Sequence, residues 1–213
     1  IVDSAGENLI AVSPGANARV CPRDVEAARE SIRTADLLLL QLEVPVETVS
    51  AAVDVAWEEG VPVLLNPAPA AGPGLRPELL RRVEYLAPNA GEALRLAGAA
   101  PGLAPEKLAD RIRTMGVQTV ILTLGESGAC ICDQDGPRTL GAPSVEPVDT
   151  VGAGDCFCGV LAVALGEGRP LDEAVLVANC AAALSVQRKG AQPSLPHREE
   201  IEQMLREYQS DSE

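Results

Sequence analysis

Two glycines and an acid stand where an apolar helix begins, in the sequence Asp149-Thr150-Val151-Gly152-Ala153-Gly154-Asp155. Gly152 and Gly154 let the backbone approach a ligand closely, and the first N–H groups of the helix have no intrahelical partners. These N–H groups and the positive end of the helix dipole form a site for an anion such as phosphate. A carboxylate beside bound phosphate, at Asp155, is suited to phosphoryl transfer. The alternative, equally compatible with this segment alone, is a glycine-rich turn in which Asp155 caps the helix.

Other catalytic motifs are absent from the sequence. It contains neither G-x-x-x-x-G-K-[ST] nor G-x-G-x-x-G, and Lys occurs only at Lys107 and Lys189. Phosphate charge must then be met by helix N–H groups, arginine and metal ions. The single histidine, His197, begins a charged C-terminal segment, which argues against Ser-His-Asp and Cys-His catalysis. Asp155 is therefore the candidate base that takes the proton of an acceptor hydroxyl.

The elements that would position these residues alternate between strand and helix from about residue 36 onward. Hydrophobic runs and Gly or Pro breaks predict strands at 35–42, 61–65, 83–87, 119–124 and 129–132, the last pairing with its predecessor as a hairpin. The same signals predict helices at 46–59, 77–82, 90–96, 105–115, 155–165, 171–186 and 197–208. Residues 133–148 are rich in Gly and Pro and predict short edge strands and loop. The pattern favours an α/β fold in three layers, a mostly parallel sheet with helices on both faces.

Polar side chains stand just past or near the ends of the predicted strands. Ligands of such sheets gather at the C-terminal ends of the strands, so these side chains indicate a single site. The residues are Glu43, Asn66, Asn89, Thr123 and Asp149.

Composition limits the classes of function. A length of 213 residues fits one domain with one substantial core. The net charge of −14 argues against a nucleic-acid surface, because phosphates would be repelled. The longest apolar run, Cys156–Gly166, is far shorter than the ~20 residues that a membrane helix needs, so we expect no membrane partner. The six cysteines lack CxxC spacing and are expected to be buried reduced thiols, which favours a cytoplasmic protein.

Six segments, in order along the chain, resemble the ribokinase-like sugar kinases. Each is weakly specific alone, whereas six in the family's order across nearly the whole chain are highly specific. With Asp149–Asp155 as the signature, the others are Gln41–Glu43, Asn66–Ala70, Asn89–Glu92, Thr123–Gly128 and Arg188–Ser194.

The resemblance implies transfer of the γ-phosphoryl group of ATP to a sugar hydroxyl, with D-ribose converted to ribose 5-phosphate as the expected reaction. It assigns Asp155 as the catalytic base and a substrate contact. It also assigns Glu43 as an acid that contacts the sugar. Without the resemblance, the sequence identifies Glu43 only as an acid at the end of a strand. The matching anion-hole residues are Gly152, Ala153 and Gly154. The matching nucleotide contacts are Asn89, Thr123, Leu124, Gly125, Glu126, Ser127, Gly128, Gly154 and Asn179.

Two of these nucleotide contacts have structural alternatives. Thr123–Gly128 offers a hydroxyl and two glycines to a nucleotide, but it also fits a plain hairpin turn. Asn179 lies on an Ala-rich helix and could equally be a satisfied core amide.

The resemblance also implies two cations. Glu92 matches an element that supports Mg²⁺ indirectly, and the alternative is a solvated acid in the first turn of a helix. Matches to the family's monovalent-cation loops provide carbonyls, one carboxylate and a hydroxyl, a set of oxygen ligands suited to K⁺. Lys189, beside them, must then point away. The matching residues are Asp149, Val151, Ser185, Arg188, Gly190 and Ser194.

The family's N-terminal part, with the first strands, a lid of short strands and a Gly-Gly motif that holds the sugar, has no counterpart before Ile1. We therefore expect residues 1–213 to be a single kinase domain that lacks the lid and first strands and does not phosphorylate ribose by itself. We expect the full-length protein to be a homodimer. The alternatives are a fructokinase-like or nucleoside kinase of the same family, or a nucleotide-binding fragment without catalysis. An oxidoreductase is disfavoured by the missing dinucleotide fingerprint.

Overall fold

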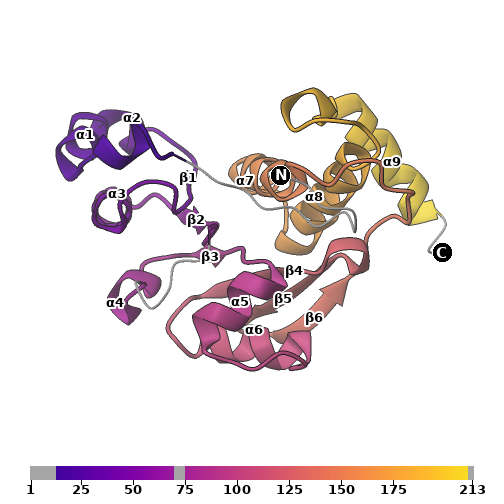
Figure 1. The fold of residues 1–213 in the computed structure, drawn as a ribbon, viewed down its shortest axis with the longest axis horizontal. Helices are drawn as coiled ribbons and strands as arrows, with labels where there is room; N and C mark the ends of the chain where they lie inside the picture. The colour runs from indigo at the N-terminus through magenta and orange to yellow at the C-terminus, as the bar shows by residue number, and fades with distance from the viewer. Residues whose placement is uncertain (1–12, 70–74, 211–213) are drawn as a thin grey trace.

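A single six-stranded sheet forms the centre of the computed structural model, which describes residues 13–69 and 75–210 (Figure 1). Neighbouring strands from β1 to β4 are parallel, whereas β4, β5 and β6 form an antiparallel meander. In the sheet the strands follow their order in the chain: β1 (Leu38–Leu40), β2 (Val63–Leu65), β3 (Tyr85–Leu86), β4 (Thr119–Thr123), β5 (Ala129–Asp133) and β6 (Gly136–Leu140).

The helices divide between the two faces of the sheet because of the strand order. Parallel strands that add in one direction through right-handed crossovers place their connecting helices on the same face. That face carries α1 (Pro22–Ala27), α2 (Arg29–Arg33), α3 (Val46–Glu59), α4 (Pro77–Leu80), α5 (Ala90–Ala97) and α6 (Pro105–Arg113). The chain crosses to the other face after the meander, where α7 (Ala153–Gly166) and α8 (Leu171–Ser185) cover the sheet and α9 (Arg198–Ser210) packs outside them (Figure 1).

Both faces of the strands are buried. In β2, Val63 and Leu65 face the core under α3–α6, whereas Leu64 faces α7 and α8. In β4, Leu122 faces the first core and Ile121 the second. Successive side chains of a strand point to opposite faces, so a strand buried on both sides is a continuous apolar run. The prediction of a three-layer, mostly parallel sheet is confirmed.

Individual elements differ from the sequence prediction mainly at their ends and at the N-terminal side. The parallel strands β1–β4 are shorter than predicted, and β3 has only two residues, whereas β5 ends one residue later than predicted. Helices α1 and α2 were not predicted. A signal for α1 exists, because Pro22 occupies its first turn and Asp24 accepts a hydrogen bond from the Cys21 N–H (2.9 Å), as in a capping box.

The cysteines agree with the expectation of reduced thiols. All six are free, and five of them are buried. Burial raises the pKa of the Cys158 thiol to about 12, so it remains protonated and unreactive at neutral pH. Among the described residues, no helix is both long and apolar enough to span a bilayer.

Candidate active site

The ends of the parallel strands meet at one edge of the sheet. Asn89, after β3, forms a parallel bridge with Thr123 at the end of β4. Asn66, after β2, donates through Nδ2 to the Ala87 carbonyl (2.7 Å), which joins the loops after β2 and β3. Glu43 is exposed just past β1. Four of the five predicted strand-end residues therefore lie where the prediction placed them.

Asp149 reaches the same region differently, because it lies well past the end of β6. Its carboxylate accepts hydrogen bonds from the Val151 N–H (3.0 Å) and the Gly190 N–H (2.8 Å). The carboxylate thus joins the loop before α7 to the loop after α8. The Gly190 and Val151 N–H groups hold the pKa of Asp149 below its usual value.

The turn before α7, predicted from the sequence to be an anion hole, is a tight turn that ends at a glycine N-cap. Gly152 is the N-cap and has a φ of 81°, a left-handed conformation that favours glycine. A Cβ at this position would lie 3.2 Å from both Cα and Cβ of Ala191, so the turn packs closely against the loop after α8. The helix then begins at Ala153, and the first N–H groups of a helix lack intrahelical acceptors.

Asp155 stands in the first turn of α7 and is exposed. No side chain caps this helix, and no described residue forms a hydrogen bond with the Asp155 carboxylate. The capping interpretation therefore has no hydrogen bond to support it. The role of Asp155 as a base stays a prediction.

A cavity of about 550 Å³ lies between the end of β4, the loop before α7, and α8. Seven of the residues predicted for the nucleotide or anion site line it: Thr123, Gly125, Glu126, Gly128, Ala153, Gly154 and Asn179. Three other predicted nucleotide residues, Asn89, Leu124 and Ser127, are not among its lining residues. Leu124 instead packs against the core under α3–α6.

One wall of this cavity was missed by sequence reasoning. The residues that form it are Ala142, Pro143, Ser144, Val145 and Pro147, from the loop between β6 and α7. Its Gly- and Pro-rich sequence predicted a loop, and the only further signal was its position directly before the Asp149–Asp155 segment. Across the cavity, α8 contributes Ala182 and Ala183, which indicates a largely apolar slot leading to the first turn of α7.

Asn89 and Glu92 form a reciprocal capping box at the start of α5. Asn89 Oδ1 accepts from the Glu92 N–H (2.9 Å), and Glu92 Oε2 accepts from the Asn89 N–H (2.8 Å). Glu92 is only 5% exposed, so it is not the solvated acid of the alternative interpretation. The indirect role of Glu92 toward Mg²⁺ stays a prediction.

The residues predicted to hold K⁺ come from the two loops that Asp149 joins. The Val186 carbonyl accepts from the N–H groups of Val148 (2.7 Å) and Asp149 (3.0 Å), which brings Ser185 and Val151 into neighbouring segments. Ser194 is buried, and its hydroxyl donates to the Ala191 carbonyl (2.7 Å). The Arg188 side chain turns to Glu200 on α9, and Lys189 is exposed.

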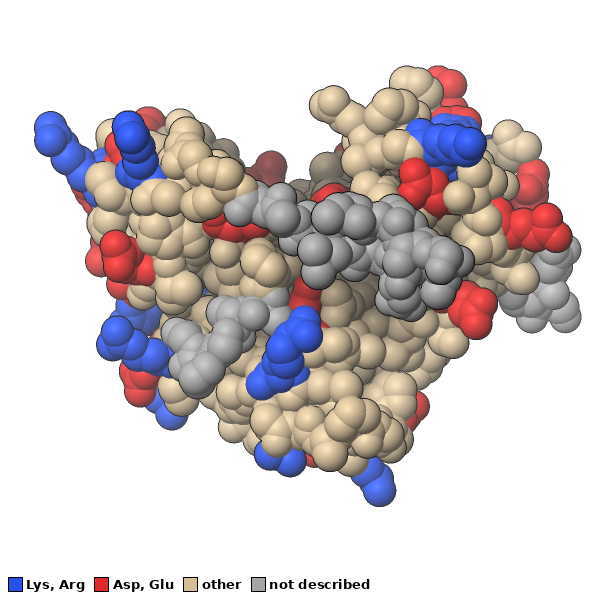
Figure 2. Space-filling view, viewed as in Figure 1, with Lys and Arg blue, Asp and Glu red and all other residues tan. Residues whose placement is uncertain are grey.

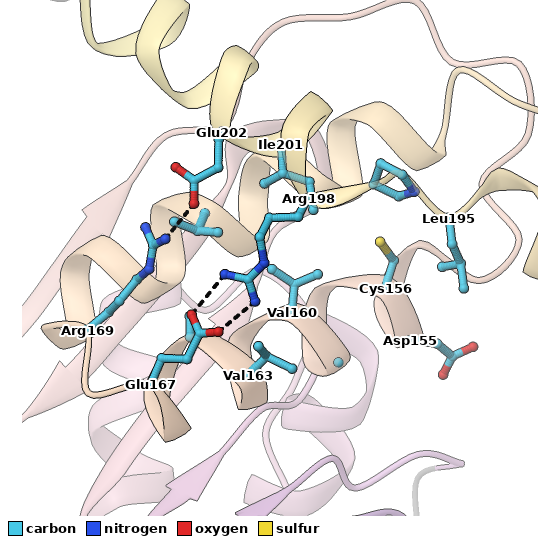
Figure 3. A pocket seen from close by; sticks show the side chains of 14 residues that line it. Asp155, Cys156, Val160, Val163, Glu167, Arg169, Leu195, Arg198, Ile201 and Glu202 are labelled. Atoms are coloured by element: carbon cyan, nitrogen blue, oxygen red, sulfur yellow. Dashed lines mark hydrogen bonds and ion pairs between the residues drawn. The ribbon is translucent and has the colours of Figure 1, made fainter.

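A second cavity, of about 340 Å³, lies between α7 and α9 (Figure 3). Two ion pairs, Arg198–Glu167 and Arg169–Glu202, border it, and Asp155 lies at its opposite end (Figure 3). In the space-filling view the molecule is hollowed between the part that carries α1–α3 and the part that carries α7–α9 (Figure 2). Asp155 lines this second cavity, and the preceding residue, Gly154, lines the 550 Å³ cavity.

Comparison with known proteins identifies the family. Residues 1–198 match the pfkB family carbohydrate kinase. The chain is 38% identical over 208 residues to a ribokinase of Schizosaccharomyces pombe, covering 95% of this chain and 65% of the relative. It is 38% identical over 207 residues to a ribokinase of Bacillus subtilis, covering 96% of this chain and 67% of the relative. The chain thus spans about two thirds of the length of these curated relatives.

Solved structures agree with the sequence match. A ribokinase from Thermotoga maritima superimposes with a TM-score of 0.86 and 37% identity, covering 96% of this chain and 67% of that one. An Arabidopsis thaliana ribokinase complexed with ribose and ATP superimposes with a TM-score of 0.84 and 33% identity, with the same coverage. With the family match over nearly the whole chain, these likenesses show that the chain belongs to the pfkB family of carbohydrate kinases.

Proposed function

We propose that the protein transfers the γ-phosphoryl group of ATP to a hydroxyl of D-ribose. The observation that carries this proposal is the position of Asp155, an exposed carboxylate without a hydrogen bond from any described residue, in the first turn of α7. In this first turn the Ala153 N–H donates to the Thr150 carbonyl (3.3 Å), whereas the N–H groups of Gly154 and Asp155 donate to no backbone acceptor among the described residues. An anion site and a free base at the same helix terminus are what phosphoryl transfer to a hydroxyl requires.

Each part of the site has a separate role in the proposed reaction. The nucleotide occupies the 550 Å³ cavity, with its phosphates toward Ala153 and Gly154. The N–H groups of the first turn of α7 stabilise the negative charge of the transferred group. Asp155 accepts the hydroxyl proton as the oxygen attacks the γ-phosphorus, and the bond between that phosphorus and the bridging oxygen breaks to release ADP. Glu43, exposed past β1, accepts hydrogen bonds from other sugar hydroxyls.

The proposed Mg²⁺ ion would be bound with little direct contribution from side chains. The part of the chain that the structure describes contains no group of three or more His, Cys, Asp and Glu side chains that could hold a metal ion. A Mg²⁺ ion would therefore be held chiefly by nucleotide phosphates and water, as is common for this ion. The capping box uses Glu92 Oε2, which leaves Oε1 to orient such a water. When bound, Mg²⁺ would neutralise part of the phosphate charge. The protein itself has a net charge of −14 and supplies little positive charge for this purpose.

The proposed K⁺ ligands fit a monovalent ion because most of them are neutral oxygens. The proposed set consists of the backbone carbonyls of Val151, Ser185, Arg188 and Gly190, the Ser194 hydroxyl, and one carboxylate, that of Asp149, which accepts from the Gly190 N–H. Such a set carries a single formal charge, equal to that of K⁺ and too low to favour a divalent ion.

The acceptor is tested by comparing sugars in the full-length protein. With MgATP and K⁺, we expect D-ribose to have a higher kcat/KM than D-fructose or a nucleoside, measured by coupled detection of ADP. This expectation is supported by the 38% identity of the chain to two ribokinases, over about two thirds of their length. A higher kcat/KM for fructose or a nucleoside would contradict ribose as the acceptor. Absence of ADP formation with every acceptor would contradict kinase activity itself.

We expect K⁺ to activate the enzyme relative to Na⁺ at equal ionic strength. The reason is that a cage of fixed carbonyls discriminates by ion size, whereas screening does not. Asp149→Asn should lower turnover and abolish the difference between the salts, because the amide puts an N–H donor where the carboxylate accepts from Gly190 or Val151. The matched control is Lys189→Ala, an exposed cation in the same loop, which should retain the difference. Equal rates of the unaltered protein in KCl and NaCl would show that these segments are structural loops only.

A further inference from the structure

The loop after α8, residues 186–197, is connected to helix α9 through the Glu200 carboxylate. The Arg188 guanidinium donates two hydrogen bonds to it, from Nη2 to Oε1 and from Nη1 to Oε2 (3.4 Å). Oε2 of Glu200 also accepts from the N–H of His197 (2.8 Å), the residue directly before α9. A two-point contact between arginine and a carboxylate fixes the direction of both side chains. Glu200 therefore joins the beginning of the loop to its end.

Glu200 is itself held by the packing of α9. The adjacent residue, Ile201, and Leu205 one turn later are buried in a cluster with residues of α7 and α8. Glu202, on the same helix, forms an ion pair with Arg169 in the loop between α7 and α8 (Figure 3). Because Glu200 lies beside these contacts, it offers the loop after α8 a fixed partner.

The same loop carries groups of the proposed active site. The Gly190 N–H donates to the Asp149 carboxylate (2.8 Å), and Ala191 packs closely against Gly152 in the turn before α7. The backbone carbonyls of Arg188 and Gly190 belong to the proposed set of K⁺ ligands. A displacement of Arg188 would therefore move K⁺ ligands and disturb the packing against the anion-hole turn.

The charge of Arg188 gives its pairing a second consequence. Its carbonyl is a proposed K⁺ ligand, whereas its guanidinium is a cation that would repel K⁺ at close range. The Glu200 carboxylate directs the guanidinium toward α9 and balances its charge. Position and charge are thus two separate ways in which Glu200 could act on the loop, and a test has to distinguish them.

We propose that Glu200 is a positioning residue, which holds the loop after α8 through the Arg188 side chain so that the Arg188 and Gly190 carbonyls are aligned for K⁺. The inference rests on the proposed function, because the K⁺ site is part of it. Glu200 lines neither of the two cavities described above, so its effect on the reaction passes through the loop. A partly exposed ion pair adds little to the stability of a protein, so the effect is expected on the loop and not on the fold.

Hydrogen–deuterium exchange of the full-length protein tests the position of the loop without an assay of activity. In Glu200→Gln, the amides of residues 187–195 should exchange roughly two- to fivefold faster, the range expected for loss of a partly exposed ion pair. The glutamine amide has one acceptor oxygen and cannot accept from both Arg188 and the His197 N–H as the carboxylate does. The matched control, Glu202→Gln, removes another ion pair of α9 and should leave exchange in the loop unchanged. Unchanged exchange in Glu200→Gln would overturn the positioning role.

The K⁺ dependence of turnover separates position from charge. Glu200→Gln should raise the K⁺ concentration for half-maximal activation roughly two- to fivefold. The double variant Arg188→Met with Glu200→Gln removes the pair without changing the net charge and keeps the Arg188 carbonyl. It should raise that concentration as much, whereas Glu202→Gln should not.

Two outcomes of the kinetic test have distinct meanings. A normal K⁺ requirement of the double variant would show that Glu200 acts only by balancing the charge of Arg188, and would overturn positioning. An unaltered protein that forms ADP at equal rates in KCl and NaCl would instead contradict the proposed K⁺ site. Hydrogen–deuterium exchange would then decide alone whether Glu200 holds the loop.

Discussion

Asp155→Asn is expected to lower kcat by a factor on the order of 10²–10⁴, the usual contribution of a positioned base. The amide has nearly the same shape as the carboxylate but cannot accept the hydroxyl proton. Because no described residue forms a hydrogen bond with the Asp155 side chain, the substitution breaks no contact of the fold. Nucleotide affinity and thermal stability should stay nearly unchanged. The measurements are steady-state kinetics with ribose, calorimetric titration with MgATP, and thermal unfolding of the full-length protein.

A matched control for this substitution is Asp135→Asn. Asp135 is also exposed, in the turn between β5 and β6, and its side chain forms no hydrogen bond with a described residue. This variant should retain full turnover, which would show that loss of an exposed carboxylate is not itself harmful. Near-normal turnover of Asp155→Asn would contradict the assignment of the base and leave Asp155 as a surface residue.

The sheet and its helices could be predicted because both faces of the strands are buried. Continuous apolar runs such as that of β4 contrast with the helical spacing of α3, and Gly60 ends that helix in a left-handed conformation. The grouping of the polar residues after β1, β2 and β3 could be predicted because ligands of such sheets bind at the C-terminal ends of the strands. Local sequence was sufficient here because each of these features depends on neighbouring residues in the chain.

Features that depend on contacts between distant segments could not be predicted. The wall of the cavity from Ala142 to Pro147 lines it together with residues of α8, which follow much later in the chain, and the loop sequence does not encode this arrangement. The amide orientation of Asn179 depends on carbonyls 38 and 39 positions away. Glu92 fits the capping-box spacing with Asn89, but whether it would be buried or solvated was not evident from that spacing.

Gly152, in the loop before α7, packs closely against Ala191, in the loop after α8. Asp149 joins the same loops through the Gly190 N–H. The position of the anion-hole turn is therefore determined by the loop after α8 as well as by α7. A residue with a side chain at Gly152 would disturb both the turn and the loop after α8. Its backbone would have to keep a left-handed φ of 81°, and its Cβ would lie 3.2 Å from Ala191.

Gly152→Ala is therefore expected to lower kcat by a factor on the order of 10², comparable to the loss of one anion-hole donor. Alanine in the left-handed conformation costs about 1–2 kcal/mol, and relief of that strain or of the contact with Ala191 shifts the turn. The unpaired N–H groups of the first turn of α7 would then lose their proposed alignment with the transferred phosphoryl group. Steady-state kinetics and thermal unfolding, measured on the same preparation, separate the catalytic loss from the loss of stability.

The control for Gly152→Ala is Gly168→Ala, just beyond the other end of α7. Gly168 has nearly the same conformation, with a φ of 79°, but a Cβ there would meet no atom within 4 Å. Both variants should lose unfolding free energy because both place alanine in the left-handed region, and Gly152→Ala should lose at least as much because of its contact with Ala191. Only Gly152→Ala should lose turnover, since only its turn supplies the N–H groups beside Asp155. Equal turnover of the two variants would show that the Gly152 turn is a helix start without a part in phosphoryl transfer.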